Sequence, residues 1–341
     1  MRVPRVGAPG AVRWTEQDEP QIGPGEVLLQ SLACGICTTD VKAVRRGDPE
    51  GHGYGLGHEL VGRILAVGDG VQWSVGQRVV VAPYVPCGVC AFCLRGQPVL
   101  CERLFEHSLD PAGLAERVRV PRPIAERGMF PVPDTLPSDI AALTEPVACC
   151  VQAAEACSIT AGDTVLIVGD GPMGLMNAAV ARAYGASFVI VAGLTPHRLK
   201  VAAQHYADAV INVAEQDLAS QVKSMTEGRG ADVVLAAVSS PDAVTSGLSA
   251  LRRGGILNAF AGVANETTVP LDLRRLHYDE LRITGSFGAA PQHLRQALYL
   301  LSRGQVYAAP LVTGRFSFED TPIAIEHSAS QIGMKAVVVF E

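Results

Sequence analysis

Aromatic side chains and long apolar runs are both scarce in this chain. Only 5% of its 341 residues are aromatic. No uninterrupted apolar run approaches the roughly 18 residues that a membrane-spanning helix needs, and residues 1–19 lack the apolar core of a secretory signal. We therefore expect a cytoplasmic protein with no membrane partner.

Positive charge is also in short supply. Lysine and arginine together number 28 against 34 aspartates and glutamates, which leaves a formal net charge of −6. Proteins that bind nucleic acids neutralise the phosphates with clustered basic side chains. No basic stretch dominates this sequence, so we expect no nucleic-acid partner.

Apolar residues and glycine, by contrast, are plentiful. Hydrophobic residues make up 48% of the chain, and 35 residues are glycine. This composition supports a large packed core with many tight turns and excludes a disordered chain. At about 150 residues per domain, the length indicates two domains.

The pattern of apolar residues divides the chain into two regions. Before about residue 145, β-rich runs are separated by glycine, proline or aspartate, at 26–34, 59–68 and 77–83. After about residue 160, apolar strands alternate with helical stretches. The strands are expected at 164–169, 188–193, 209–213, 231–238, 255–262 and 282–287, with helices that include 173–184 and 198–206. This alternation is typical of a parallel sheet covered on both faces.

The C-terminal part breaks the alternation. Residues 291–302 are expected to form a helix, and residues 335–341 an apolar strand with no further α/β unit to join. We expect this strand to fold back onto the first region.

Four of the nine cysteines stand close together in CGVCAFCLRGQPVLC. Their spacing is C-x2-C-x2-C-x7-C, and the residues are Cys87, Cys90, Cys93 and Cys101. Four thiolates can enclose a zinc ion with no open position, which is typical of a structural site. The alternatives are an iron–sulfur cluster, although the fourth cysteine lies too far along the chain and lacks a following proline, or buried thiols. We predict a structural zinc lobe over residues 85–103.

A more dispersed set of metal-ligand residues lies on either side of that loop. Cys37 lies in ACGICTTD, His58 and Glu59 lie in GLGHEL, and Glu145 begins EPVACC. One thiolate, one imidazole and one carboxylate leave a fourth position on zinc for water or substrate, which is the pattern of a catalytic site. Each residue alone is also compatible with an ordinary core or turn position.

The remaining cysteines and histidines carry no such pattern. Cysteine outside a cluster usually packs as a small apolar side chain, and we assign that role to Cys34, Cys149, Cys150 and Cys157. We assign no ligand role to His52, His107, His197, His205, His277, His293 and His327.

A glycine-rich turn follows the predicted strand at 164–169. The run VGDGPMG contains G-x-G-x-x-G and leads into a predicted helix, which is the context that a dinucleotide-binding turn requires. The first glycine permits the tight turn, the second lets the backbone approach the pyrophosphate, and the third lets helix and strand pack closely. The predicted contacts are Gly169, Gly171, Pro172, Met173 and Gly174. A plain strand-to-helix turn is the alternative.

The next predicted strand ends without the acidic residue that usually binds the ribose 2′-hydroxyl of NAD. Gly193 stands in its place, followed by Thr195, His197 and Arg198, which could receive a 2′-phosphate. The sequence therefore favours NADP over NAD, although an arginine in this position also occurs in NAD enzymes.

Taken together, these motifs resemble the zinc-dependent medium-chain dehydrogenase/reductase family, which includes alcohol, sorbitol and threonine dehydrogenases. CGICTTD, GHE, the four-cysteine loop and the glycine-rich turn occur in the family's order and spacing over nearly the whole chain. The Glu145–Pro146 pair resembles the polyol-dehydrogenase branch. The resemblance implies an α/β fold, with a Rossmann doubly wound parallel-sheet domain at 147–288 and a mainly-β GroES-like catalytic domain at 1–146 and 289–341.

The resemblance also implies roles for individual residues. Cys37, His58 and Glu145 would hold a catalytic zinc, and Glu59 would be an exchanging ligand or would lie just behind the ligands. Thr39 would relay the alcohol proton, and Asp40 would orient His58. Two zinc ions per chain, NAD(P) as cofactor and a homodimer or homotetramer would complete the enzyme. The substrate would be a secondary alcohol or polyol, oxidised by hydride transfer to the nicotinamide.

Three departures from the family pattern bear on the chemistry. Lys42 stands where many members have a histidine at the end of the proton relay, Gly193 replaces the acidic residue, and Arg117 replaces an aromatic residue. The segment EGHGYGLGHE is unusually rich in glycine. Two alternative functions stay open: a carbonyl or enone reductase of the same superfamily, and a non-catalytic dinucleotide-binding protein.

Overall fold

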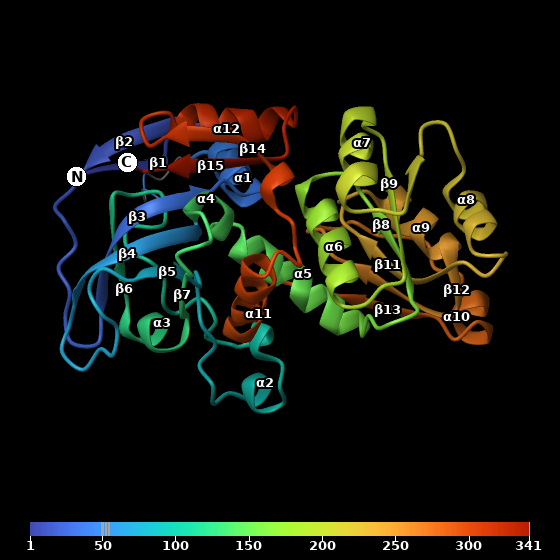
Figure 1. The fold of residues 1–341 in the computed structure, drawn as a ribbon, viewed down its shortest axis with the longest axis horizontal. Helices are drawn as coiled ribbons and strands as arrows, with labels where there is room; N and C mark the ends of the chain where they lie inside the picture. Colours follow the sequence, from blue (N-terminus) through green and yellow to red (C-terminus); the bar gives the residue numbers. More distant parts are fainter. Residues whose placement is uncertain (49–50, 52, 54, 341) are drawn as a thin grey trace. The chain divides into compact units, whose positions relative to one another are not determined.

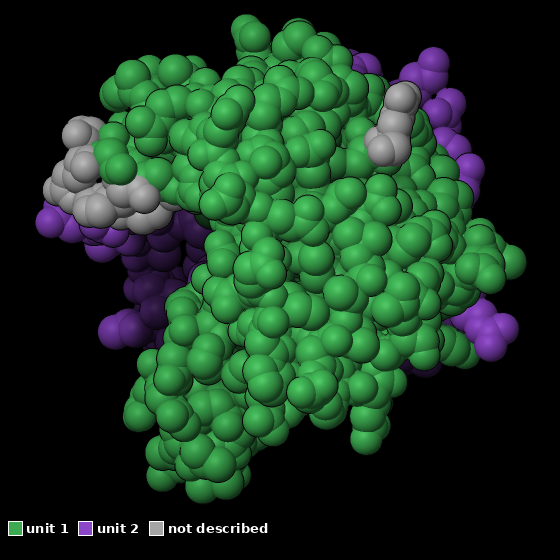
Figure 2. Space-filling view, turned by 90° about the vertical axis from the view of Figure 1, so that its left-hand side faces the viewer, with its two compact units in different colours: residues 1–145, 289–302, 308–341 green, residues 146–288, 303–307 purple. Residues whose placement is uncertain are grey.

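The computed structural model describes residues 1–48, 51, 53 and 55–340. The chain divides into two compact units (Figures 1 and 2). Unit 1 comprises residues 1–145, 289–302 and 308–341, and unit 2 comprises residues 146–288 and 303–307. Figure 2 colours unit 1 green and unit 2 purple.

Unit 1 is built on a seven-stranded sheet. Its strand order is β14-β15-β3-β4-β5-β7, with β6 paired to β3 beside this path. The strands are β3 (Val27–Gly35), β4 (Glu59–Val67), β5 (Arg78–Val81), β6 (Arg117–Val120), β7 (Met129–Pro131), β14 (Val312–Ser317) and β15 (Lys335–Val339). A separate two-stranded ribbon consists of β1 (Arg2–Val6) and β2 (Val12–Glu16).

Short helices accompany this sheet. They are α1 (Thr38–Arg46), α2 (Ala91–Leu94), α3 (Arg122–Arg127), α4 (Ser138–Ala141), α11 (Pro291–Ser302) and α12 (Thr321–Ser330), with the 3-10 turns η1 (Pro98–Leu100) and η2 (Ala309–Leu311). Apolar side chains from α1, α12 and β15, with Cys34 of β3, form one buried cluster. Phe318 belongs to this cluster, and its ring packs edge-on against Trp14 with 5.1 Å between the ring centroids.

The C-terminal strand joins residues from opposite ends of the chain. β15 pairs antiparallel with β3, where Val337 faces Gly35, and parallel with β14. The strand therefore folds back onto the first region, as its sequence predicts. This pairing brings the start of β15 to the end of β3, where the metal-ligand motif CGIC begins.

Unit 2 contains a six-stranded parallel sheet with the order β10-β9-β8-β11-β12-β13. The strands are β8 (Thr164–Val168), β9 (Phe188–Gly193), β10 (Ala209–Asn212), β11 (Ala231–Ala236), β12 (Leu251–Ala259) and β13 (Arg282–Gly285). Numbered within the unit, this order is 3-2-1-4-5-6, the doubly wound arrangement of dinucleotide-binding domains. The predicted α/β fold class is confirmed.

The helices of unit 2 follow its strands in alternation (Figure 1). They are α5 (Thr144–Cys157, whose first two residues belong to unit 1), α6 (Pro172–Ala183), α7 (Pro196–His205), α8 (Leu218–Met225), α9 (Pro241–Ala250) and α10 (Leu273–Tyr278). The first strand β8 is buried at every position, because a sheet covered on both faces leaves no side for solvent.

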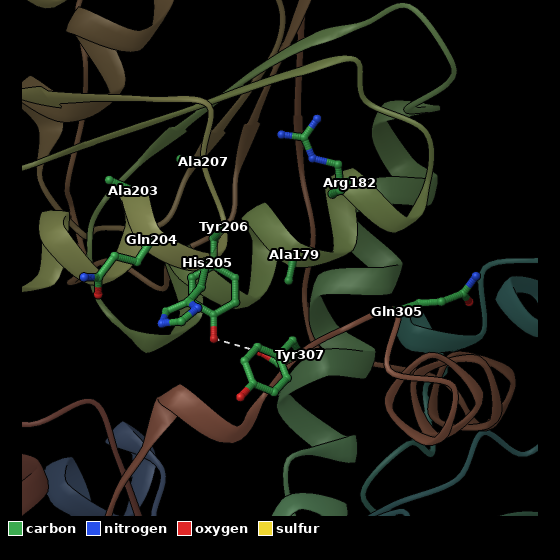
Figure 3. A pocket seen from close by; sticks show the side chains of 9 residues that line it. All are labelled: Ala179, Arg182, Ala203, Gln204, His205, Tyr206, Ala207, Gln305 and Tyr307. Atoms are coloured by element: carbon green, nitrogen blue, oxygen red, sulfur yellow. Dashed lines mark hydrogen bonds between the residues drawn. The ribbon is translucent and has the colours of Figure 1, made fainter.

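One short segment belongs to a different unit from the one that the sequence indicates. Residues 303–307 were expected in the returning catalytic segment but group with unit 2. The Tyr206 hydroxyl donates a hydrogen bond to the carbonyl oxygen of Tyr307 at 2.8 Å, and the two side chains stand close to His205 (Figure 3). These contacts, which no local sequence pattern encodes, attach the segment to α7.

The same segment helps to line an open pocket of about 280 Å³ in unit 2. The pocket is lined by Ala179, Arg182, Ala203, Gln204, His205, Tyr206, Ala207, Gln305 and Tyr307 (Figure 3). It lies at the C-terminal ends of α6 and α7, whereas the glycine-rich turn lies at the N-terminal end of α6. The pocket is therefore separate from the predicted dinucleotide site.

One helical segment, Ser138–Cys157, is long and apolar enough to span a membrane, although the sequence has no uninterrupted apolar run of that length. Length and hydropathy alone admit this 20-residue segment, with a mean hydropathy of 1.2. However, 67% of the qualifying window is buried inside the structure, as it is in core helices that pass the same test. A turn at residues 142–143 divides the segment into α4 and α5.

Candidate metal centres and dinucleotide turn

Cys37, His58 and Glu59 come together where β3 ends and β4 begins. Cys37 precedes α1, and Glu59 starts β4 directly opposite Gly35 in the antiparallel pair. One ligand atom from each of the three residues lies within 4.8 Å of the others. The antiparallel register of β3 and β4 thus brings Cys37 to His58 and Glu59, which follow it in the sequence only after α1.

The carboxylate of Glu59 is buried in an unusual environment. Its residue is only 1% exposed, and among the described residues Oε2 has no hydrogen-bond partner. This oxygen lies against Gly35, where any Cβ would overlap it, so a larger residue could not replace that glycine. An unpartnered buried carboxylate oxygen is costly unless a cation is nearby. The donor set and this oxygen together fit a metal ion.

Lys335 supplies one positive charge to this site. Its buried Nζ donates to Glu59 Oε1 at 2.5 Å and to the carbonyl oxygen of Ile36 at 2.8 Å. Burial alone would lower the pKa of Lys335, but the charges of Glu59 and Cys37 raise it. The sequence analysis missed this residue. A lysine at the start of an otherwise apolar strand was the available signal.

Asp40 braces the backbone on both sides of the cluster. Its Oδ2 accepts from the Cys37 N–H at 2.9 Å, and its Oδ1 accepts from the Gly57 N–H at 2.8 Å. His58 Nδ1 lies 4.0 Å from Oδ1, which is beyond hydrogen-bond distance. Asp40 thus lies beside His58 as a charge, while its hydrogen bonds hold the two segments that carry Cys37 and His58; the orienting role stays a prediction.

The surroundings of His58 favour the protonated form of its imidazole when no metal is bound. Burial lowers the pKa of this imidazole, but the hydrogen bond with Cys37 and the negative charges of Asp40 and Glu145 raise it well above its ordinary value. Glu145 thus acts electrostatically on the cluster. It does not belong to the group of mutually close ligand atoms among the described residues. Among the described residues the structure groups Glu59 with Cys37 and His58, and the ligand role of Glu145 stays a prediction.

The relay residues lie near the surface. Cys37 Sγ lies 3.5 Å from the hydroxyl oxygen of Thr39, and Thr39 and Lys42 are both exposed on α1.

The other departures from the family pattern lie outside this cluster of ligand atoms. Arg117 lies in β6, and its guanidinium donates a hydrogen bond to the carbonyl oxygen of Glu116 at 3.0 Å. In the glycine-rich segment before His58, the residues at 50, 52 and 54, which include His52, lie outside the described residues.

The four clustered cysteines form a second group of close ligand atoms. Sulfur–sulfur distances are 3.5 Å between Cys90 and Cys93 and 4.0 Å between Cys87 and Cys93. The backbone N–H of Cys87 donates to Cys101 Sγ at 3.2 Å, and the N–H of Cys90 donates to Cys87 Sγ at 3.3 Å. Converging thiols with backbone donors fit the tetrahedral sulfur site of a structural zinc.

The four thiols differ in acidity when no ion is present. The Val89 N–H lowers the pKa of Cys87 to about 6, whereas burial and neighbouring thiols raise the pKa of Cys93 to about 12. Closely packed thiolates repel one another, so a divalent cation is needed before all four can ionise together.

The cysteines assigned to the core are mostly buried. Cys34, Cys150 and Cys157 are at most 2% exposed, as predicted, while Cys149 is half-buried. Of the histidines, His293 is buried and its Nδ1 accepts from the Ala290 N–H at 3.0 Å. No described histidine besides His58 belongs to a group of metal-ligand atoms.

The glycine-rich turn has the geometry that its sequence predicts. Gly169 has φ of 128°, a value that strongly favours glycine, and a Cβ on Gly174 would overlap the carbonyl oxygen of Gly169. Gly171 directly precedes α6 and faces open space, with Arg198 Nη1 4.0 Å from its Cβ position. Pro172 and Met173 occupy the first turn of the helix, whose N-terminus favours a bound phosphate.

The loop after β9 corrects one inference from the sequence. Gly193 ends β9 without a carboxylate of its own, but the Asp170 carboxylate fills the space beside it. Asp170 Oδ2 accepts from the Leu194 N–H at 3.0 Å and the Thr195 N–H at 2.7 Å. The sequence analysis treated this place as lacking an acid, because Asp170 is 23 positions earlier in the chain and only the fold brings it there.

The other predicted cofactor residues lie at the start of α7. Thr195 is the residue before the helix, and His197 and Arg198 are on its first turn. Arg198 is buried beside Gly171, whereas His197 is exposed. The structure thus brings Gly193, Thr195 and Arg198 to the glycine-rich turn.

Comparisons with known proteins agree with this geometry. The family described as alcohol dehydrogenase GroES-like domain matches residues 23–134, and the family described as zinc-binding dehydrogenase matches residues 172–303. Sorbitol dehydrogenase of Bacillus subtilis is 35% identical over 316 residues, covering 91% of this chain and 88% of the relative. The chain belongs to the zinc-dependent medium-chain dehydrogenase family.

Solved structures of this family superpose on the whole chain. Alcohol dehydrogenase TADH of Thermus sp. ATN1 has a TM-score of 0.90 at 28% identity, with both chains fully covered. A zinc-binding dehydrogenase of Sinorhizobium meliloti 1021 bound to NADP has a TM-score of 0.89 at 28% identity, covering 99% of this chain and 98% of that one. The protein is an enzyme of the zinc-type dehydrogenase class.

Proposed function

We propose that this chain is an NAD(P)-dependent zinc dehydrogenase that oxidises the hydroxyl group of a secondary alcohol or polyol. The observation that carries the proposal is the convergence of Cys37, His58 and Glu59 within 4.8 Å, with one carboxylate oxygen of Glu59 buried and unpartnered. The relation to sorbitol dehydrogenase supports the polyol class. A carbonyl or enone reductase and a non-catalytic dinucleotide-binding protein are not favoured by these relatives.

The residues that would hold the catalytic zinc follow from the donor set. Cys37 and His58 would supply sulfur and nitrogen, and a carboxylate from Glu145 or Glu59 would complete the protein ligands. Zinc, when bound, supplies a Lewis acid that lowers the pKa of an alcohol hydroxyl. Lys335 holds Glu59 through Oε1, while Oε2 has no hydrogen-bond partner among the described residues and would be available to a metal ion.

The other residues of this site would manage protons and position. Thr39, beside Cys37, would accept the alcohol proton and pass it toward solvent, a step that its exposure permits. Asp40 would keep the Cys37 and Gly57 backbones in register through its two hydrogen bonds. The glycine-rich turn and the N-terminus of α6 would bind the pyrophosphate of the dinucleotide.

The four-cysteine lobe at residues 85–103 would hold the second zinc. Its helix α2 has no buried residue, so apolar packing contributes little to its order and a metal would be the main source of stability. In this proposal unit 1 is the catalytic domain and unit 2 the dinucleotide-binding domain.

The oligomeric state belongs to the same proposal. Strand β13 is last in the sheet order of unit 2, and apolar side chains near it are exposed: Leu271, Leu273, Tyr278, Ile283 and Phe287. An exposed apolar sheet edge favours pairing with a second copy of the chain. A homodimer or homotetramer through this edge, and a cytoplasmic location, stay predictions.

The test is a panel of polyols, cyclitols, amino alcohols and secondary alcohols, assayed by nicotinamide absorbance with NAD+ and NADP+ on zinc-replete protein. Turnover that a chelator abolishes and added zinc restores supports the proposal. Dinucleotide binding with no turnover on any alcohol, accompanied by reduction of carbonyl or enone substrates, would favour the reductase. Absence of dinucleotide binding would contradict both.

A further inference from the structure

The loop between β9 and α7 has no acidic residue of its own, but the carboxylate of Asp170 packs against it. Asp170, the second residue of the G-D-G-P-M-G turn, is 8% exposed and lies against Gly193. A Cβ built on Gly193 would overlap Asp170 Oδ2 and lie 2.5 Å from its Cβ and Cγ, and these are its three nearest atoms. The side chain of Asp170 therefore occupies the volume in which a side chain at position 193 would begin.

The carboxylate is held in place by the backbone of the loop. Oδ2 accepts from two successive N–H groups, those of Leu194 at 3.0 Å and Thr195 at 2.7 Å. Successive N–H groups at a strand-to-helix turn are the donors that would otherwise be open to an anion. Here an internal carboxylate already occupies them.

We propose that Asp170 is the residue that recognises the adenosine ribose and selects NAD over NADP. This inference rests on the proposed function, because it concerns the dinucleotide that unit 2 would bind. An ionised carboxylate has about four acceptor sites, so two bonds to Oδ2 leave capacity for the hydroxyl groups of a ribose. A 2′-phosphate would meet a like charge at the same place and would find the two N–H donors taken.

The same geometry explains the departure at Gly193. In most dinucleotide-binding turns of this type the acidic residue ends the second strand. In this chain the acid is contributed by the glycine-rich turn, and glycine at 193 is the residue that leaves room for it. In this proposal the acid has moved from the end of β9 to the glycine-rich turn. The sequence preference for NADP rested on the missing acid at Gly193 and on Thr195, His197 and Arg198 as possible contacts of a 2′-phosphate, and this proposal replaces it by a preference for NAD.

The proposal is tested by binding, measured by fluorescence titration of the zinc-loaded protein with NADH and NADPH, independent of any substrate. We expect the wild-type chain to bind NADH about tenfold or more tightly than NADPH. Asp170→Asn keeps an acceptor for the two N–H groups and removes the charge, so we expect the preference to fall to near unity or to reverse.

A second variant distinguishes recognition from a purely structural brace. Asp170→Gly with Gly193→Asp returns the acid to the end of β9, since the three nearest atoms around the Gly193 Cβ position are side-chain atoms of Asp170, its Cβ included, and glycine removes them all. We expect this double variant to recover the NADH preference that Asp170→Gly loses. Gly193→Asp alone should melt at a lower temperature than wild type, because its side chain collides with Asp170. It should prefer NADH over NADPH no more strongly than wild type does.

Each other outcome is decisive. An unchanged ratio of NADH to NADPH affinity in Asp170→Asn, or an equal loss of both affinities, makes Asp170 a structural brace and overturns the inference while the proposed function stands. A wild-type chain that prefers NADPH overturns it directly. A wild-type chain that binds neither dinucleotide overturns the proposed function and this inference together.

Discussion

Lys335 Nζ lies 2.5 Å from Glu59 Oε1, although 276 residues separate the two in the chain. Both side chains are buried, at 6% and 0% side-chain exposure. The ion pair joins the first residue of the last strand to the first residue of β4, beside the proposed catalytic metal ligands. This buried ion pair in unit 1 therefore forms only when the C-terminal strand has paired with β3.

Removing the lysine should leave the Glu59 carboxylate buried without its counter-charge. We expect Lys335→Met to lower the free energy of unfolding by about 3–5 kcal/mol, the usual cost of breaking a buried ion pair. The measurement is the melting temperature of metal-free and zinc-loaded protein. Lys223→Met, at an exposed lysine of α8, is the control and should melt like wild type. Equal melting of both variants would show that the pair contributes nothing.

The catalytic-zinc hypothesis predicts a separation between turnover and dinucleotide binding. Cys37→Ser and His58→Ala should abolish turnover and reduce the bound zinc from two ions per chain toward one, because two groups of ligand atoms become one. NADH affinity should stay unchanged. His205→Ala, at an exposed imidazole in unit 2, is the control. Glu145→Gln should also release zinc if Glu145 is a ligand, and full retention of zinc would restrict the carboxylate role to Glu59.

The four-cysteine lobe should depend on its metal for order. We expect Cys101→Ser to lose one zinc ion and to lower the melting temperature, because the short helix α2 has no buried residue. Limited proteolysis should then cleave within residues 85–103. Cys149→Ser, outside both groups of ligand atoms, should keep both zinc ions. A variant at Cys101 with unchanged melting and zinc content would contradict the structural-zinc assignment.

The contribution of the Tyr206–Tyr307 hydrogen bond to the free energy of unfolding should depend on pH. Burial, with a contribution from Tyr307, raises the pKa of Tyr206 above its ordinary value. In the unfolded chain a tyrosine ionises near pH 10, so the stabilisation by Tyr206 is fully present below about pH 10 and is lost as the pH rises toward its folded-state pKa. Tyr206→Phe should lose about 1 kcal/mol at pH 8.

Denaturation of wild type and Tyr206→Phe at several pH values tests this sign. The difference in unfolding free energy between them should shrink as the pH passes 10, since only wild type has this group to ionise. Tyr299→Phe, at an exposed ring of α11, is the control. A difference that grows with pH would contradict the assignment.

The edge of the sheet in unit 2 should govern assembly. Ile283 of β13 is 44% exposed, and we expect Ile283→Lys to reduce the oligomer toward a monomer, because charge on a strand edge opposes pairing. Light scattering after size-exclusion chromatography gives the mass. Val75→Lys, at an exposed residue of unit 1, is the control. An unchanged mass for Ile283→Lys would place the interface elsewhere.

Much of this architecture could be predicted from local patterns. Strands β8 and β9 were expected at 164–169 and 188–193 and lie at Thr164–Val168 and Phe188–Gly193, because buried parallel strands are written as continuous Val, Ile and Leu. The helices α6 and α7 begin one or two residues before their expected starts, each with proline in the first turn. The four cysteines and the glycine-rich turn are local motifs, so their spacing alone was informative.

The contacts that the sequence analysis missed connect residues far apart in the chain. Asp170 reaches Gly193 because β8 and β9 pair, and Lys335 reaches Glu59 because β15 and β4 both pair with β3. A pattern over neighbouring residues contains no information on such pairs. Long-range folding likewise decides the partners of Asp40. The sequence singled out this residue beside His58, but its hydrogen bonds go to the backbone N–H groups of Cys37 and Gly57.

The sequence by itself determined the family, the fold class, the two sets of metal-ligand residues and the dinucleotide turn, because each depends on residue type at short, regular spacing. Only the tertiary structure showed that Glu59 lies with Cys37 and His58, that Lys335 balances its charge, and that the Asp170 carboxylate fills the space beside Gly193. Those outcomes depend on distances between side chains that are remote in sequence, and packing alone sets such distances.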